Sequence, residues 1–175
     1  METNIAFKKM EEEDIPFFVD LRNSCVDYLH CSQTFTEEEA LKWYKNTDPL
    51  FYIISLVERE FPIIATQRVG YFRTSNYSSK NKNIYIGADI SEKHRGKGLG
   101  TKAYLKFIPF LFEELDLHKI SLEVLETNER AANLYLKVGF VIEGTKREEA
   151  WKNGEYVDST IMSILREEWE NNVMP

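Results

Sequence analysis

The chain has 175 residues and a formal net charge of -7 at pH 7, with 43% hydrophobic and 29% charged residues. This composition is typical of one globular domain, and the acidic balance argues against nucleic-acid binding, which needs clustered lysine and arginine. No run approaches the roughly 18 apolar residues of a membrane helix, and the first residues lack the apolar centre of a signal peptide. We therefore expect a single domain over residues 1–175, located in the cytoplasm, with no nucleic-acid or membrane partner.

The first part of the chain predicts one strand followed by two helices. Residues 4–10 alternate in polarity, and residues 11–29 carry apolar side chains at helical spacing after an acidic opening. Thr36 and Glu39 form a capping-box pattern ahead of an apolar run, which predicts the start of the second helix.

The two cysteines, Cys25 and Cys31, have no clustered ligand partners nearby, so we expect ordinary reduced thiols. His30 precedes Cys31, but adjacency alone does not make a catalytic pair. Three histidines scattered over the chain give no zinc-binding pattern. The sequence therefore predicts no metal.

The middle of the chain predicts antiparallel strands followed by a helix. Three segments rich in β-branched and aromatic residues follow one another, with the polar stretch 75–83 separating the last two: 51–58, 63–72 and 83–90. Apolar residues then recur at helical spacing from Gly98 to about Leu115. Pro109 lies inside this pattern and predicts a kink or a break near residues 105–108, because proline removes a backbone donor and clashes with the preceding turn.

The last part predicts a strand, a capped helix and a hairpin. Residues 119–125 are typical of a strand, in which Ile120, Leu122 and Val124 share one face. Asn128 is the expected N-cap of a helix that ends at Gly139, with a further strand from about Phe140. Asn153-Gly154 predicts a tight hairpin turn within residues 147–165. The whole pattern indicates one α/β domain with mixed strands.

The stretch HRGKGLGT, residues 94–101, places three glycines at every second position directly between a strand and a helix. A nucleotide-hydrolase phosphate loop needs the pattern G-x-x-x-x-G-K-[ST]. It is excluded, because Thr101 and not a lysine follows Gly100, and Arg95 and not a glycine lies five residues before Gly100. The pattern G-x-G-x-x-A over residues 98–103 matches a dinucleotide fingerprint, but that motif belongs to a parallel sheet. The remaining interpretation is a run of backbone N–H groups at a helix start that binds a pyrophosphate.

Two motifs together resemble the GNAT superfamily of N-acetyltransferases, which transfer acetyl from acetyl-CoA to an amine. They are R-G-K-G-L-G at residues 95–100 and N-E-R-A-A-N-L-Y-L-K-V-G-F at residues 128–140. The ending at residues 144–158 is similar to the branch containing ribosomal-protein N-terminal, spermidine and amino-sugar acetyltransferases. The resemblance implies an α/β (α+β) fold, with a mixed, mostly antiparallel sheet that splays at the acetyl-CoA site and helices on both faces.

The resemblance also implies how acetyl-CoA is bound. The strand over residues 83–90 would pair with the pantetheine arm through its backbone, and the glycine-rich residues would hold the pyrophosphate, so that bulk at Gly98 or Gly100 would occupy the phosphate's space with the fold intact. The implied cofactor-binding residues are Ile90, Ser91, Arg95, Gly96, Lys97, Gly98, Leu99, Gly100, Thr101, Asn128 and Asn133.

Acetyl transfer expels a thiolate, so the site needs an acid near sulfur. By its place in the family pattern, Tyr135 is the candidate catalytic acid. The base stays open among four side chains and a water chain: Glu123, Tyr85, Asp89 and Glu126. Direct transfer in a ternary complex is expected, and an acetyl-enzyme on Cys25 or Cys31 is the rival.

The acceptor is a small-molecule or peptide amine, for which three classes are open: an amino sugar, a protein N-terminus or a polyamine. We favour the first two. An acidic pocket would suit a polyamine, whereas an aromatic surface would suit a sugar or a nucleotide base, and the candidates for it are Tyr28, Phe35, Trp43 and Tyr44. A homodimer is compatible with the resemblance. The alternative to an enzyme is a non-catalytic CoA-binding sensor or interaction module of the same fold.

Overall fold

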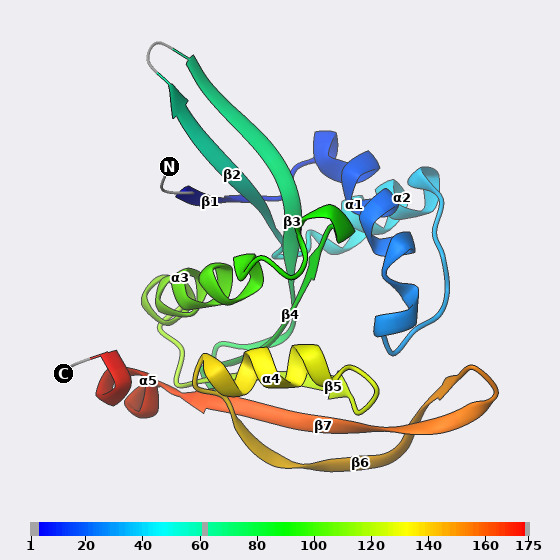
Figure 1. Cartoon of the computed structure of the whole chain (residues 1–175), viewed down its shortest axis with the longest axis vertical. Helices are drawn as coiled ribbons and strands as arrows, with labels where there is room; N and C mark the ends of the chain where they lie inside the picture. Colours follow the sequence, from blue (N-terminus) through cyan, green and yellow to red (C-terminus); the bar gives the residue numbers. More distant parts are fainter. Residues whose placement is uncertain (1–3, 61–62, 174–175) are drawn as a thin grey trace.

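The computed structural model describes residues 4–60 and 63–173. Its centre is a seven-stranded sheet in the order β1-β2-β3-β4-β5-β7-β6 (Figure 1). The strands are β1 Asn4–Lys9, β2 Tyr52–Glu60, β3 Ile63–Ser78, β4 Asn83–Ile90, β5 Lys119–Leu125, β6 Val141–Lys152 and β7 Glu155–Leu165. The helices are α1 Ile15–Ser24, α2 Glu37–Thr47, α3 Leu99–Glu114, α4 Glu129–Lys137 and α5 Arg166–Val173, with short 3-10 turns η1 Glu12–Asp14, η2 Val26–Tyr28 and η3 Glu92–His94.

Neighbouring strands in the sheet are antiparallel except for β4 and β5, which run parallel. This pair is joined only between residues 83–85 and 119–121. Beyond Tyr85 and Ser121 the two strands separate, so the predicted splay is confirmed, and the edge of β4 from Ile86 to Ile90 has no β5 partner. A mostly antiparallel sheet also rules out the dinucleotide-binding interpretation of the glycines.

Helices cover both faces of the sheet, as predicted. The larger apolar core lies between the sheet and α3 with α4, and a second core lies between the sheet and α1 with α2. Tyr71 and Phe72 show the division, because these consecutive, fully buried residues of β3 belong to the second and first core respectively. In Figure 1, α1 and α2 lie together at the upper right, whereas α3 lies to the left and α4 below the centre.

Two helix predictions differ from the structure. The segment 11–29 is not one helix, because α1 ends at Ser24 and the chain turns at Cys25 before η2. The N–H of Cys25 donates to the Arg22 carbonyl at 3.1 Å, and its carbonyl accepts from the Tyr28 N–H at 2.9 Å. α3, in contrast, continues through Pro109, so of the predicted kink or break the break is wrong. Leu105, whose carbonyl loses its donor, is 55% exposed, so water can satisfy that group.

The strand before the turn at residues 79–82 is longer than predicted. β3 continues through the polar residues as far as Ser78, which pairs with Asn83. The prediction ended this strand too early because residues 75–78 are polar. This end of the hairpin is partly exposed, so strand residues there need not be apolar.

The capping predictions for the second half are confirmed. The Asn128 side chain accepts the N–H of Ala131 at 3.3 Å, and Gly139 follows α4 with a φ of 102°. The N–H of Phe140 donates to the Tyr135 carbonyl at 3.0 Å, which completes a Schellman-type end. Asn153 and Gly154 both have positive φ, 51° and 92°, as a two-residue hairpin turn requires.

Within the described residues, no helix combines the length and the apolar character that crossing a membrane requires.

Candidate active site

A cavity of about 750 Å³ opens where β4 and β5 separate. Side chains from both faces of the sheet line it, so it passes through the sheet at the splay. Its acceptor end, as we name it, is formed by Cys25, Tyr28, Leu29, His30, Arg73 and Asp89. Its cofactor end is formed by the glycine loop, residues 95–101, and by the start of α4. The side chain of Arg95 extends from this loop to the acceptor end, where its Nη2 lies 3.0 Å from Sγ of Cys25.

Most of the predicted cofactor-binding residues line this cavity. They are Ile90, Arg95, Gly96, Gly98, Leu99, Gly100, Thr101, Asn128 and Asn133. Ser91 and Lys97 do not line it. The Ser91 hydroxyl lies 2.7 Å from Nδ1 of His94, and the Lys97 ammonium donates to the Lys93 carbonyl at 2.9 Å.

The glycine loop has the backbone geometry of an anion site. Gly96 and Gly98 have φ values of 77° and 74°, in the left-handed region that favours glycine. The first backbone hydrogen bond of α3 runs from the Lys102 N–H to the Gly98 carbonyl at 3.1 Å. The N–H groups of Leu99, Gly100 and Thr101 precede it, so they are free of the helical ladder and lie at the positive end of the helix dipole.

Gly100, which lines the cavity, also packs against α4. A Cβ atom there would lie 2.8 Å from Cδ1 of Leu134 in α4, whereas a Cβ at Gly98 would meet nothing within 4 Å. The missing side chain at Gly100 therefore lets α3 and α4 approach each other.

We expect Gly100→Val to lower the stability of the fold by about 1–3 kcal/mol, because the added methyl groups collide with Leu134. Thermal unfolding measures this effect. The double variant Gly100→Val with Leu134→Ala removes the collision partner, so it should be more stable than the sum of the two single changes implies. Simple additivity of the two changes would contradict the packing role.

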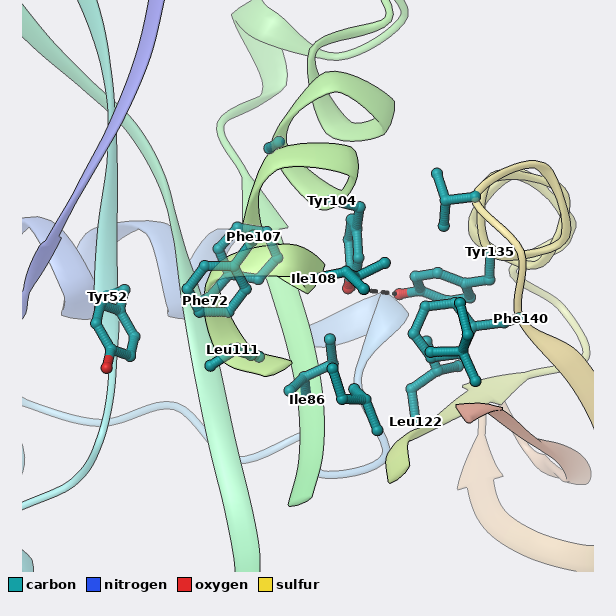
Figure 2. Close-up of a cluster of buried hydrophobic side chains, with 14 of the residues drawn as sticks. Tyr52, Phe72, Ile86, Tyr104, Phe107, Ile108, Leu111, Leu122, Tyr135 and Phe140 are labelled. Carbon is teal, nitrogen blue, oxygen red and sulfur yellow. Dashed lines mark hydrogen bonds between the residues drawn. The ribbon is translucent and has the colours of Figure 1, made fainter. Parts of the chain in front are cut away.

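Tyr135 projects from α4 toward Tyr104 of α3 (Figure 2). Its side chain is 8% exposed, and its hydroxyl oxygen accepts a hydrogen bond from the Tyr104 hydroxyl at 3.5 Å. Burial raises the pKa of Tyr135 above its ordinary value of 10.0, outweighing the Tyr104 hydrogen bond and the charge of Arg73, which lower it. Tyr135 is therefore protonated at neutral pH. Because Tyr104 is the donor in their hydrogen bond, the O–H of Tyr135 stays available to donate elsewhere.

Asp89 is held by two donors at the acceptor end. Nη1 of Arg73 and the hydroxyl of Tyr71 each lie 2.5 Å from its Oδ2. Gly87 makes room for this contact, because a Cβ there would lie 2.8 Å from Nε and Nη2 of Arg73. Burial raises the pKa of Tyr71 most, and the negative charge of Asp89 raises it further. Asp89 is therefore a structural acceptor, which weakens it as a candidate base.

Of the other three candidate bases, only Glu123 lines the cavity. Glu123 of β5 lines the cavity and pairs with Lys146 at 2.7 Å. Tyr85 and Glu126 do not line this cavity, and the Glu126 side chain accepts the N–H of Asp158 at 3.0 Å. Of the four candidates, the structure thus brings Glu123 and Asp89 to the site.

His30 is a site residue that the sequence did not indicate. Its Nε2 lies 2.7 Å from Oγ of Ser159 and 4.0 Å from Oε2 of Glu123. Burial is the largest influence on the pKa of His30 and lowers it below 6.5, although the negative charge of Glu123 acts to raise it. The imidazole is therefore neutral at pH 7. No local pattern predicts this site, because His30 and Ser159 are 129 residues apart in the chain.

Arg130 is a second residue that the sequence did not indicate. It lines the cavity, and its Nη2 lies 3.5 Å from where a Cβ of Gly96 would be. Its guanidinium thus adds positive charge beside the glycine loop. The N-E-R-A-A pattern contains Arg130, so its place in the first turn of a cavity-facing helix was the available signal.

Comparison with known families decides the identity. The family described as acetyltransferase (GNAT) domain matches residues 4–141, which include the glycine loop, the splay and α4. The chain belongs to this family. It is therefore a GNAT acetyltransferase, as the two sequence motifs implied.

Curated relatives of this GNAT chain are N-acetyltransferases. The putative ribosomal N-acetyltransferase YdaF of Bacillus subtilis is 33% identical over 101 residues, which cover 58% of this chain and 55% of that protein. The spermidine N(1)-acetyltransferase of Vibrio cholerae is 27% identical over 175 aligned positions, with 98% of both chains covered.

Solved structures show the same GNAT fold. Spermidine N-acetyltransferase from Vibrio cholerae, in complex with CoA and spermine, superposes with a TM-score of 0.83 at 24% identity, covering 95% of this chain and 98% of that one. The putative acetyltransferase YncA from Salmonella typhimurium, with acetyl-CoA, has a TM-score of 0.72 at 16% identity and covers 92% of this chain and 93% of that one.

This GNAT chain is accordingly an acetyl-CoA-dependent N-acetyltransferase that acetylates an amine. Its cavity has the parts that this chemistry needs. An anion-type loop lies at one end, and a protonated tyrosine and a neutral histidine line the same space.

Proposed function

We propose that this enzyme transfers the acetyl group of acetyl-CoA directly to the primary amine of a small molecule, within a ternary complex. The observation that carries the proposal is the single cavity through the splayed sheet, which joins the glycine loop to Tyr135 and to the acceptor end. Two substrates that enter from opposite faces can meet there without a covalent enzyme intermediate.

In this proposal the cofactor lies along the cofactor end. The N–H groups of the glycine loop bind the pyrophosphate, and Arg130 adds a nearby positive charge. The pantetheine arm pairs with the free edge of β4 between Ile86 and Ile90. Because Oδ1 of Asn128 caps α4, its amide nitrogen is left to donate to the cofactor, and Asn133 lines the same wall.

Tyr135 is the proposed acid and His30 the proposed base. Ser159 donates its one hydroxyl proton to the Val124 carbonyl at 3.3 Å, so Nε2 of His30 carries the proton that it shares with Ser159 and Nδ1 keeps a lone pair.

The proton transfers then balance. Nδ1 of His30 takes one proton from the ammonium group, and the free amine attacks the thioester carbonyl carbon. When the C–S bond breaks, Tyr135 gives its proton to sulfur and recovers one from the new amide nitrogen. His30 returns its proton to solvent, so the products are an amide, CoA thiol and one proton.

Release of CoA thiol tests the proposal. The enzyme is mixed with acetyl-CoA and a panel of small primary amines, and free thiol is followed with time. At least one amine should give stoichiometric thiol and acetylated amine. Calorimetric binding of acetyl-CoA, without thiol release for any amine, would instead support the sensor alternative.

Neither cysteine serves as an acyl carrier in this proposal. Cys25 is buried at the acceptor end, where burial first, and the Asp89 charge second, raise the pKa of its thiol. Cys31 is exposed and does not line the cavity. A buried thiol with a raised pKa is a poor nucleophile.

The double variant Cys25→Ala with Cys31→Ala should therefore keep turnover within about threefold of the parent, since no covalent intermediate forms on either thiol. Steady-state kcat measures this, and mass spectrometry after mixing with acetyl-CoA alone should show an unmodified chain. Complete loss of turnover in a folded double variant would favour an acetyl-enzyme.

A polyamine is the second candidate acceptor, and the full-length similarity to the Vibrio cholerae spermidine acetyltransferase favours it. The amino sugar and the protein N-terminus remain proposals as well. Thioester aminolysis with this acid and base needs no metal in the proposed mechanism. A cytoplasmic location and a homodimer also stay predictions.

A further inference from the structure

We propose that the acceptor carries an anionic group, a carboxylate or a phosphate, near its amine, and that Arg73 and Arg95 bind this group at the acceptor end. The inference rests on the proposed function, and it narrows the acceptor class. It predicts that a polycation is a poor acceptor.

Two guanidinium groups, those of Arg73 and Arg95, line the acceptor end together with the carboxylate of Asp89. Nη1 of Arg73 bonds to Asp89 at 2.5 Å, and Nη2 of Arg95 lies 3.0 Å from Sγ of Cys25. Burial raises the pKa of Cys25 most. The charge of Asp89 raises it further, and the charges of Arg95 and Arg73 lower it. Arg22 does not line this end, but its charge, like that of Arg73, lowers the otherwise raised pKa of Tyr71, which donates to Asp89.

The positive charge of these arginines is not balanced within the described residues. Asp89 pairs with Arg73, and neither Arg22 nor Arg95 forms an ion pair with a carboxylate there. Their contacts are neutral, since Arg95 lies over the Tyr28 ring at 5.1 Å and Arg22 over the Phe35 ring at 5.6 Å. In a chain of net charge -7, unbalanced arginines at a cavity indicate a site for an anion.

One polar atom here has no partner at all among the described residues. Nη1 of Arg22 is buried and makes no hydrogen bond. Leaving a charged donor unpaired costs stability, so this atom calls for an explanation, and an anion bound nearby is one. Arg22 does not line the cavity itself, and its charge acts on Tyr71.

Two arginines that line the cavity have donors without a partner among the described residues. Arg95 uses its Nε for the Ile90 carbonyl, at 2.8 Å, and one Nη for Cys25, which leaves its other Nη free. Arg73, whose side chain is 34% exposed, uses Nη1 for Asp89. Guanidinium groups fixed in this way are preorganised for the two oxygens of a carboxylate or phosphate.

The rest of the acceptor end does not reverse this balance. Glu123 and Glu149 are the other carboxylates near His30, and Lys146 pairs with both of them, at 2.7 and 3.4 Å. A di- or tricationic polyamine would therefore bring its additional ammonium groups toward Arg73 and Arg95 with no free carboxylate to bind them. An amine with its own negative charge meets complementary charge instead.

Matched acceptor pairs test the inference, with kcat/KM as the readout. The pairs are 4-aminobutyrate against putrescine, and glucosamine 6-phosphate against glucosamine. The anionic member should be preferred by about tenfold or more, as one added charge-assisted contact predicts. The two pairs separate a carboxylate from a phosphate as the preferred anion. Equal rates within both pairs, or spermidine as the best acceptor, would overturn the inference while leaving the proposed acetyl transfer intact.

Variants locate the preference. Arg95→Gln should reduce the preference for the anionic member, whereas Lys80→Gln, a change of an exposed cation at the β3–β4 turn, should keep it. An unchanged preference in both Arg95→Gln and Arg73→Gln would reject the assigned residues. Because Arg73→Gln leaves Asp89 without its ion pair, its folding is checked by thermal unfolding, and the Arg95 result stands without it.

A binding measurement covers the case in which no panel amine is acetylated. The four amines and inorganic phosphate are titrated calorimetrically into the enzyme with CoA bound. Tighter binding of the anionic members supports the inference even then, although the proposed function would have failed. Absence of binding by both anionic members would overturn the inference.

Discussion

Tyr135→Phe should lower kcat by about 100-fold or more, because a general acid contributes roughly 10²–10⁴ to the rate. The change removes one oxygen and leaves the ring, which packs edge-on against Tyr104 and Phe140 with centroids 5.3 and 6.0 Å apart. The fold and the binding of acetyl-CoA should therefore be retained. Steady-state kinetics separates the two effects, since KM for acetyl-CoA should change little while kcat falls.

Tyr104→Phe is the matched control for this result. It also removes one buried hydroxyl, and it takes away the hydrogen bond that lowers the pKa of Tyr135 without removing the Tyr135 proton. Its effect on kcat should be much smaller. Equal losses in the two variants would indicate that the hydroxyl pair supports the structure, and unchanged kcat in Tyr135→Phe would remove Tyr135 from the acid role.

The pH profile gives a further check on Tyr135. An acid acts in its protonated form, so activity is present below its pKa and is lost as the pH rises through it. Because burial raises that pKa above 10.0, no loss of activity from Tyr135 should occur between pH 7 and pH 9.

The cofactor end was largely predictable from sequence because its determinants are local. The positive φ values of Gly96 and Gly98 belong to a short loop at a helix start, and the Asn128 cap is fixed within three residues. Spacing within one loop or one helix is readable from the chain alone. The exception is Gly100, whose close neighbour Leu134 lies on another helix.

The acceptor end was not predictable, because residues far apart in the chain form it. His30 meets Ser159 across 129 residues, and Lys152 of β6 donates to the Val26 carbonyl at 3.0 Å across 126 residues. Such contacts depend on the break after α1 at Cys25, which apolar periodicity does not reveal. His30 was not among the four candidate bases for this reason. Strand alternation can place Glu123 on a face of the sheet, but it cannot predict that a loop histidine lies beside it.

His30→Gln should lower kcat by about 100-fold or more, which is the contribution expected of a general base. Glutamine keeps an N–H donor for Ser159 but has no group that accepts a proton at neutral pH. The variant should therefore fold and bind acetyl-CoA as the parent does. Measured at saturating substrates, kcat reports the reaction of the bound complex.

The pH dependence of kcat has a sign that follows from the surroundings of His30. Glu123 of β5, Arg73 of β3, and Glu149 and Lys146 of β6 act on it with opposing charges, and burial, the largest cause, lowers its pKa below 6.5. A base acts in its neutral form, so activity is present above this pKa and is lost as the pH falls through it. The parent should thus keep full kcat at pH 7 and lose it below pH 6.5, and His30→Gln should lack this limb.

Two further variants make the result specific. His118→Gln changes an exposed histidine outside the cavity and should leave both kcat and its acidic limb unchanged. Ser159→Ala keeps His30 but removes the oxygen that fixes its Nε2 proton, so kcat should fall less than in His30→Gln while the limb persists. An acidic limb that survives in His30→Gln would assign the base to Glu123 or to a water chain, because only a group other than His30 could then be titrating.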